Sequence, residues 1–186
     1  DIYIMHRDNK EIPVGEFIDV LNDRKNNNKF KIFGASNWSL ERFIEANVWA
    51  KNNNKSGFSI LNNNLSLCKM IKPLWDGCVS SNDEKILDYL EKTKTAHLSW
   101  SSQGRGYFLS DKKVQEIENQ ISKNETWRKP GEHSSGPLSC FDSKDNRERK
   151  KRTILLAKKF NTTNQNIAGA WPINLNFPSF ALIGPR

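Results

Sequence analysis

Residues 31–50 read KIFGASNWSLERFIEANVWA, a short apolar run followed by a longer amphipathic one. The run from Lys31 to Ser36 has the length and composition of a buried strand. Ser39 is a favourable N-cap residue, and Glu41 in the first turn suits the positive end of a helix. Four apolar side chains then recur at helical spacing: Phe43, Ile44, Val48 and Trp49. This stretch therefore predicts a strand joined by a short turn to a helix.

The same alternation of strand and helix continues along most of the chain. Further strands are predicted over residues 2–6, 58–62, 96–101 and 180–184. Further helices are predicted over residues 15–27, 83–94, 146–160 and from Thr162 or Thr163 to Trp171. Strands that alternate with helices form βαβ units and a parallel sheet. The asparagines at 26–28 and 52–54 end the first two helices, where asparagine tolerates the left-handed conformation.

The predicted fold class is α/β, a (β/α)8 TIM-type barrel of which only about the last five strand–helix units are present. A complete barrel has eight strands in about 250 residues, whereas this chain has 186 residues. The chain begins on one predicted strand and ends at the tip of another, which alone would expose two sheet edges of the buried type. We therefore expect residues 1–186 to form a single, partial barrel domain, a fragment or processed form.

Residues 106–140 break the alternation, because they show little apolar periodicity and contain several turn-forming residues. These are Gly106, Pro130, Gly131, Gly136 and Pro137. Long loops without regular structure in compact domains are usually functional lids or disordered segments. We expect an extended, mobile loop over the face of the sheet where the strands end.

The composition excludes several classes of function. No apolar run approaches the roughly 18 residues that cross a bilayer, so no membrane association is expected. The three cysteines, Cys68, Cys78 and Cys140, form no CxxC pair and predict neither a zinc site nor a disulfide framework. We expect a reduced, cytoplasmic protein without a metal site.

The formal net charge is +8, and much of it lies in the run RERKKR at residues 147–152. A nucleic-acid-binding surface would carry a basic stripe with interleaved aromatic residues or a known reader motif. This run contains no aromatic residue, so a solvated helix face is the favoured interpretation and no nucleic-acid partner is expected. The positive field is also compatible with a phosphate-bearing ligand.

In a parallel barrel, the functional residues lie at the carboxyl ends of the strands. The residues at those positions are His6, Ser36, Asn37, Asn62, the run from Trp100 to Arg105, and the run from Gly184 to Arg186. They include a titratable ring, amide and hydroxyl groups, a large aromatic side chain, a glycine-flanked loop and a cation. A flat heteroaromatic carboxamide with a phosphate tail would suit this set, although composition alone does not name the ligand.

Several of these residues also have a purely structural interpretation. An isolated histidine at a strand end is usually structural, and a lone tryptophan is more often part of a core than a ligand platform. The segment Ser36-Asn37-Trp38 is compatible with a helix N-cap. We expect His97 and His133 to be structural.

The triplet His6-Arg7-Asp8 mimics the catalytic loop of protein kinases. That loop requires an asparagine five residues after its aspartate, and Pro13 stands there in this chain. No glycine-rich phosphate loop precedes the triplet, so we exclude a kinase.

Four blocks of the sequence together resemble a known family. They read IYIMHRDNKEIPVGEFIDVLN at 2–22, FGASNWSLERFIEANVWA at 33–50, SWSSQGRGYF at 99–108 and PSFALIGPR at 178–186. In this order and at this spacing they resemble successive blocks of the aldo-keto reductases, and most closely those of a bacterial branch. That branch sometimes forms the rear domain of longer dehydrogenase-like proteins. The resemblance covers nearly the whole chain and is weakest across residues 106–140.

The resemblance implies an oxidoreductase that reduces an aldehyde or ketone with a nicotinamide cofactor, NADP(H) or NAD(H), with a lean toward NADP(H). His6 matches the catalytic histidine that hydrogen-bonds the substrate carbonyl, and such a donor stabilises the oxyanion that forms as hydride arrives. Ser36 and Asn37 match the pair that binds the nicotinamide carboxamide through both donors and acceptors. Trp100 matches the aromatic residue stacked under the nicotinamide ring.

The other matched residues belong to further cofactor-binding segments of the family. The loop that runs beside the pyrophosphate is matched by Ser101, Ser102, Gln103, Gly104 and Arg105. Gly184 and Arg186 match the start of the segment that reaches the adenosine phosphate. Asn62 stands where the family has glutamine, so its amide contact with the cofactor would be shortened.

Other departures from the family bear on activity. The family's catalytic Asp, Tyr and Lys align before residue 1; the Tyr donates the proton and the Lys lowers its pKa. Neither Tyr3 nor Tyr107 matches the position of that Tyr. Pro172 interrupts a helix that normally continues for another turn. We therefore expect this chain alone to be inactive, and to need the N-terminal barrel strands in the same chain or in trans.

Two other functions remain open at this stage. One is a non-enzymatic domain that binds nicotinamide nucleotides or regulates a partner on the same scaffold, because a fold does not determine a function. The other is a degenerate fragment that binds nothing. The residues upstream of Asp1 would separate these alternatives from the enzyme, whose small carbonyl substrate the sequence does not identify.

Overall fold

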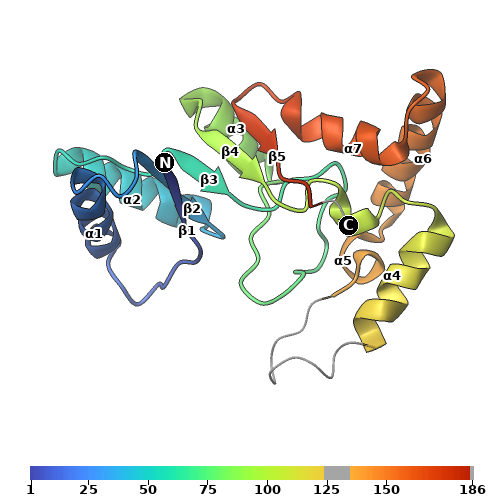
Figure 1. The fold of residues 1–186 in the computed structure, drawn as a ribbon, viewed down its shortest axis with the longest axis horizontal. Helices are drawn as coiled ribbons and strands as arrows, with labels where there is room; N and C mark the ends of the chain where they lie inside the picture. Colours follow the sequence, from blue (N-terminus) through green and yellow to red (C-terminus); the bar gives the residue numbers. More distant parts are fainter. Residues whose placement is uncertain (124–134, 185–186) are drawn as a thin grey trace.

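The computed structural model describes residues 1–123 and 135–184 of the chain. Its centre is a sheet of five parallel strands in the order β1-β2-β3-β4-β5 (Figure 1). The strands are β1 (Ile2–Met5), β2 (Ile32–Ser36), β3 (Ile60–Asn62), β4 (Ala96–Ser99) and β5 (Ser179–Ala181). The order of the strands in the sheet is their order in the chain, so each strand after β1 pairs with the strand that precedes it in the sequence. The predicted α/β fold with a parallel sheet is confirmed.

Helices connect the strands and cover the sheet. Those in the described ranges are α1 (Val14–Asn26), α2 (Leu40–Asn52), α3 (Glu84–Thr93), α4 (Asp111–Lys123), α5 (Pro137–Phe141), α6 (Lys144–Lys159) and α7 (Asn164–Ile173). The predicted cap of α2 is present, since Ser39 Oγ accepts a hydrogen bond from the N–H of Arg42 at 3.3 Å. Asn28 and Asn54 adopt left-handed conformations just after α1 and α2, as predicted.

The main apolar core lies between the sheet and helices α1, α2 and α3. Phe33 and Leu61 from the strands and Ile18, Phe43 and Leu90 from the helices are all buried in it. Burying a side chain of this size stabilises a fold by roughly 1.5–3 kcal/mol. This core holds helices α1, α2 and α3 against the sheet.

A second apolar cluster is built from segments that follow the carboxyl ends of β3 and β4, together with α5 and α7. Its buried members are Cys68, Leu74, Tyr107, Phe108, Cys140, Phe141 and Ala168. Two of them, Cys68 and Leu74, belong to the long connection between β3 and α3, called here the β3–α3 loop (residues 63–83). This cluster fixes the β3–α3 loop against the C-terminal half of the chain.

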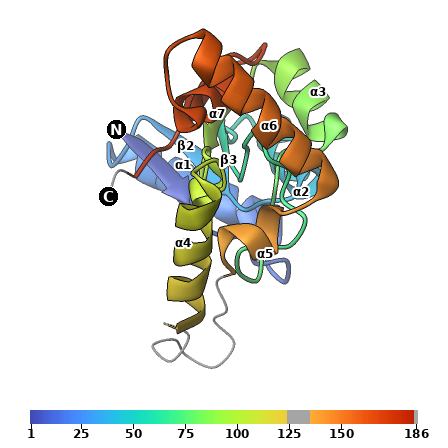
Figure 2. The ribbon, with the colours of Figure 1, turned by 90° about the vertical axis from the view of Figure 1, so that its right-hand side faces the viewer.

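Residues 106–140 differ from the expected extended loop. Two helices, α4 and α5, form within this stretch and lie beside each other (Figure 2). Val114, Ile117 and Ile121 have the i, i+3, i+7 spacing of an amphipathic helix, but polar residues dilute the pattern and Val114 alone is buried in α4. The rest of the predicted loop, residues 124–134 with His133, lies outside the described residues.

Pro172 does not prevent the last helix from forming. It lies inside α7, which ends one residue later at Ile173. At its end, Asn174 donates its N–H to the carbonyl of Trp171 and its Nδ2 to the carbonyl of Ala170, at 3.2 and 2.7 Å. Among the helices that the structure describes, none is long and apolar enough to cross a membrane.

The two outermost strands, β1 and β5, each pair with one neighbour in the described part of the chain. They carry large apolar side chains that are exposed: Ile2 and Tyr3 on β1, Phe180 on β5 and Leu182 just after it. Exposed apolar strand edges are templates for pairing with further strands.

His97 is a buried histidine in the middle of β4. Its Nδ1 lies 2.9 Å from Ser99 Oγ, and its Nε2 lies 3.0 Å from Ser81 Oγ at the end of the β3–α3 loop. Desolvation lowers the pKa of His97 to about 3. The neutral ring therefore ties the loop to the sheet, in agreement with the structural role predicted for it.

We expect the free energy of unfolding to fall as the pH is lowered from about 6.5 toward about 3. The unfolded chain binds a proton at His97 near its ordinary pKa of 6.5, whereas the folded chain resists protonation until the pH approaches 3. Protonation thus favours the unfolded state in this window, with a slope of at most about 1.4 kcal/mol per pH unit. Urea titrations between pH 7 and pH 5 measure the effect.

The His97→Gln variant should lose this part of the pH dependence. His6→Gln is the matched control, because His6 is exposed and should leave the slope unchanged. An unaltered slope in His97→Gln would contradict the assignment.

Candidate functional site

Four of the predicted site residues lie at one edge of the sheet. Asn62 is the last residue of β3, and His6, Asn37 and Trp100 directly follow the last residues of β1, β2 and β4. Because neighbouring strands are parallel, these carboxyl ends share one edge, as predicted from the sequence.

His6 is exposed and makes no hydrogen bond or ion pair with the described residues. The two residues after it are both anchored. Arg7 Nη1 donates to the carbonyl of Asp76 at 2.7 Å, and Asp8 forms an ion pair with Arg42. The imidazole is thus available to a ligand, on a segment of backbone that is held from both sides.

Ser36 and Asn37 are buried and already bonded to their surroundings. Asn37 adopts a left-handed conformation with φ 58°, and its Nδ2 donates to Ser36 Oγ at 3.2 Å. Its Oδ1 accepts a hydrogen bond from the N–H of Val79 at 3.2 Å. In Asn62, Nδ2 donates to the carbonyl of Leu98 at 2.6 Å. A carboxamide ligand would therefore have to exchange with internal partners at this pair.

Trp100 is half-buried and stacks on Trp75 of the β3–α3 loop. The two ring centroids lie 5.2 Å apart, with 25° between the ring planes. The backbone N–H of Trp100 donates to the carbonyl of Asn63 at 3.3 Å. One face of Trp100 is thus backed by another aromatic ring, which fixes the plane of the indole.

The β3–α3 loop is the part of this region that the sequence did not reveal. Figure 1 shows it leaving the end of β3 and passing below the sheet before it returns to α3. Through Trp75, Asp76 and Val79 it contacts the residues that follow β4, β1 and β2 in turn. It therefore connects three strand ends that are far apart in the sequence. Trp75 stands in a stretch without helical or strand periodicity, so no periodic signal identified it.

A cavity of about 500 Å³ lies where β4 and β5 end. Five residues that the family resemblance assigns to cofactor binding line it: Ser101, Ser102, Gln103, Arg105 and Gly184. The lining also includes apolar residues, which are Ile117 and Ile121 of α4 together with Leu109, Leu182 and Ile183. Arg186, the last predicted site residue, lies outside the described residues.

The polar wall of the cavity is a tight loop fixed by internal hydrogen bonds. Ser102 Oγ donates to the carbonyl of Leu182 at 2.9 Å, and Gln103 Nε2 donates to the carbonyl of Gln165 at 3.1 Å. Ser101 and Arg105 both have positive φ, near 50°. Such conformations cost of order 1–3 kcal/mol each, and they cluster at ligand-binding sites.

Gly104 lets this loop pass close to the second apolar cluster. Its φ is 61°, and a Cβ added to it would collide with Sγ of Cys68. Burial raises the pKa of the Cys68 thiol to about 12, so this sulfur acts as an apolar neighbour of the loop and not as a nucleophile.

Tyr107, the tyrosine nearest to the cavity loop, is poorly suited to donate a proton. Its Oη donates to Asp142 Oδ1 at 3.2 Å. Burial and the negative charge of Asp142 raise the pKa of Tyr107 above its ordinary value. A tyrosine that donates a proton near neutral pH needs the opposite shift.

Comparisons with known proteins support the fold. No protein-family model matches the chain, and no curated protein matches it. Among solved structures, a thermostable aldo-keto reductase crystallised with the inhibitor epalrestat matches with a TM-score of 0.59 and 16% sequence identity. The match covers 100% of this chain and 50% of that one, so the chain spans half the length of that reductase. At this identity the likeness concerns the fold alone: the five-stranded parallel sheet corresponds to part of a TIM-type barrel.

We expect Gly104→Ala to lower the free energy of unfolding by about 1–3 kcal/mol, because the new methyl group meets Cys68 and positive φ disfavours alanine. Gly184→Ala is the matched control, since nothing lies within 4 Å of a Cβ at that position. Urea unfolding monitored by tryptophan fluorescence measures both variants. Equal stability of the two would show that the close approach at Gly104 has no energetic weight.

Proposed function

We propose that this chain is the cofactor-binding part of an aldo-keto reductase, whose complete protein reduces an aldehyde or ketone with NADP(H) or NAD(H). The observation that carries the proposal is the cavity at the ends of β4 and β5. Five residues that a family resemblance assigns to the dinucleotide line this one cavity, although β4 and β5 lie about eighty residues apart in the chain. Its volume, about 500 Å³, falls in the range of small-molecule sites.

The chemistry of the cavity suits the phosphate end of a dinucleotide. Hydroxyl and amide groups of Ser101, Ser102 and Gln103 form one wall, and Arg105 adds a positive charge. Ile117 and Ile121 offer apolar surface to a purine ring on the other side. A site lined by apolar, polar and cationic side chains fits a nucleotide better than it fits an uncharged sugar or a lipid.

The nicotinamide end would lie beside Trp100 and the Ser36–Asn37 pair. Trp75 backs one face of Trp100, so the nicotinamide ring stacks on the opposite face in this proposal. The carboxamide would replace Val79 as the partner of Asn37 Oδ1, or share it. Asn62 contributes at most a short amide contact, because its Nδ2 is bonded to Leu98.

His6 would act on the substrate. When bound, the cofactor supplies the hydride, and the protein supplies position and electrostatics. An N–H of His6 donates to the carbonyl oxygen and stabilises the negative charge that develops there. The free, exposed imidazole at the end of β1 is compatible with this role.

The proton donor would come from strands that complete the barrel. We propose that these strands, carrying the family's Tyr, Lys and Asp, belong to the same chain or to a partner in trans. The exposed apolar side chains of Ile2, Tyr3 and Phe180 on the outer strands support such pairing. The 186 residues alone would bind cofactor but not turn it over.

A second candidate is a nucleotide-binding domain without enzymatic activity. The bond between Asn37 Oδ1 and Val79 favours it, because an internal ligand already occupies the proposed carboxamide contact. The two candidates differ in whether the complete protein transfers hydride.

Replacing Trp100 by alanine should weaken NADPH binding to the chain by roughly 2–10-fold, since a stacked aromatic pair contributes about 0.5–1.5 kcal/mol beyond its buried area. Quenching of tryptophan fluorescence, or calorimetric titration, measures the dissociation constant. Trp49→Ala is the matched control, because Trp49 lies on α2 and contacts Lys55 far from the strand ends. Equal affinity of the wild type and Trp100→Ala would exclude Trp100 as the nicotinamide platform.

We expect the isolated chain to reduce no aldehyde, and the complete protein to do so. In the complete protein, His6→Ala should slow hydride transfer by about 10²–10³-fold and leave NADPH affinity nearly unchanged, because the imidazole faces the carbonyl oxygen. Single-turnover oxidation of NADPH at saturating aldehyde separates the two effects. Normal turnover by the isolated chain would refute the proposed division of catalytic groups. An inert complete protein that binds NADPH would favour the second candidate.

A further inference from the structure

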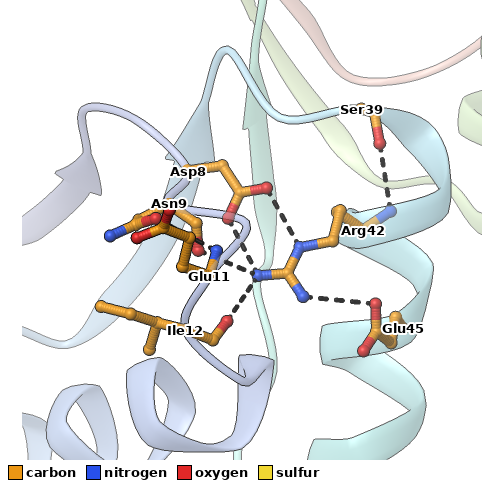
Figure 3. Close-up of polar contacts among 7 residues, drawn as sticks. All are labelled: Asp8, Asn9, Glu11, Ile12, Ser39, Arg42 and Glu45. Carbon is orange, nitrogen blue, oxygen red and sulfur yellow. Dashed lines mark hydrogen bonds and ion pairs between the residues drawn. The ribbon is translucent and has the colours of Figure 1, made fainter.

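Arg42 on α2 forms a two-point ion pair with Asp8, two residues after His6 (Figure 3). Its Nε donates to Asp8 Oδ2 at 3.0 Å, and its Nη2 donates to Asp8 Oδ1 at 3.0 Å. The side chains are 15% and 8% exposed. Planar, two-point arginine–carboxylate pairs combine strength with defined geometry, and lysine does not reproduce that geometry.

The same guanidinium closes the loop between β1 and α1. Its Nη2 also donates to the carbonyl of Ile12 at 2.9 Å and, more weakly, to that of Asn9 at 3.4 Å (Figure 3). Within the loop, the N–H of Glu11 donates to Asn9 Oδ1, and the N–H of Ile12 donates to the carbonyl of Asn9, both at 3.1 Å. Residues 8–12 therefore form a compact turn with Arg42 at its centre.

The other side of Arg42 is tied to the turn that carries Ser36 and Asn37. Its guanidinium carbon lies 5.5 Å from the ring centroid of Trp38, which is fully buried. Its backbone N–H is the donor to the Ser39 cap. One side chain thus connects the segment after β1 with the segment after β2.

The backbone of His6 is fixed on both sides by these contacts. Before it, Met5 pairs with Ala35 in the sheet. After it, Arg7 is bonded to the β3–α3 loop and Asp8 to Arg42. Since the imidazole itself makes no bond with the described residues, these anchors are what determine where it can reach.

We propose that Arg42 is a positioning residue that, through Asp8, holds His6 in register with Ser36 and Asn37. The inference rests on the proposed function, in which His6 meets the carbonyl and the other two residues meet the nicotinamide. Hydride transfer requires the substrate carbonyl and the nicotinamide ring at a defined separation. A misplacement of about 1 Å can slow such a step by roughly 10²-fold. Arg42 sets that separation from outside the site.

Kinetics of the complete protein test this role. Arg42→Ala and Asp8→Asn should each slow single-turnover hydride transfer by roughly 10²-fold and change NADPH affinity less than about threefold, because positioning affects the chemical step more than cofactor binding. The double variant should be no slower than either single one, since both remove the same link. Added guanidinium should restore part of the rate of Arg42→Ala, whereas Arg42→Lys should stay slow. Arg24→Ala, in an exposed pair with Asp23, is the control and should match the wild type.

A second measurement needs no activity. In the labelled 186-residue chain, Arg42→Ala should shift the ring resonances of His6 and increase its mobility, while those of buried His97 stay unchanged as evidence of an intact fold. Should Arg42→Ala not fold, Asp8→Asn, which preserves shape, carries the same test. Unchanged His6 resonances together with unchanged rates would overturn the proposal, as would equal loss of cofactor affinity and rate. If the wild-type complete protein neither binds NADPH nor reduces aldehydes, the proposed function fails, and the His6 resonances still decide whether Arg42 positions that residue.

Discussion

All five strands of the sheet run in the same direction. Because of this constraint, the polar residues that follow the strands lie together at one edge of the sheet. Each strand is followed by a segment at the same edge, where the regular ladder gives way to isolated backbone bonds, such as the one from the N–H of Trp100 to the carbonyl of Asn63. Asparagine side chains satisfy many of the backbone groups that remain. Asn37 accepts from the N–H of Val79, Asn63 donates to the carbonyl of Trp38, and Asn64 donates to the carbonyl of Trp100. Bonds from side chain to backbone thus supplement the few backbone bonds that remain at this edge.

The parts of the fold that depend on local signals could be predicted from the sequence. The cap at Ser39 and the left-handed asparagines after α1 and α2 need only their immediate neighbours. The start of β3 was placed two residues too early for a non-local reason. The N–H of Phe58 donates to Asn47 Oδ1 at 2.7 Å, and its carbonyl accepts from Asn47 Nδ2 at 3.2 Å, so a side chain on α2 takes the bonds that a strand would have made.

The candidate site divides in the same way. Its strand-end residues could be located because a parallel sheet brings them to one edge whatever their identity. Their partners could not, because Trp75 and Arg42 reach them across the tertiary structure, and neither an unpatterned loop nor the periodicity of a helix tells which distant residue a side chain contacts. The helix α4 escaped prediction because it buries so little, with Val114 as its one buried side chain. The spacing of apolar residues predicts a helix only when several buried side chains repeat it.

The attachment of the β3–α3 loop to the strand ends has a kinetic consequence. A ligand that competes with Val79 for Asn37 can bind only to the fraction of molecules in which that hydrogen bond is broken. Its apparent affinity is then its intrinsic affinity multiplied by that fraction, and its association rate is limited by how often the loop opens. The second apolar cluster includes Cys68 and Leu74 of the loop, and Trp75 and Cys78 pack against it, so the cluster opposes the opening of the segment around Trp75 to Val79. Substitutions in that cluster would thus alter the speed of ligand entry and release without touching any residue that contacts the ligand.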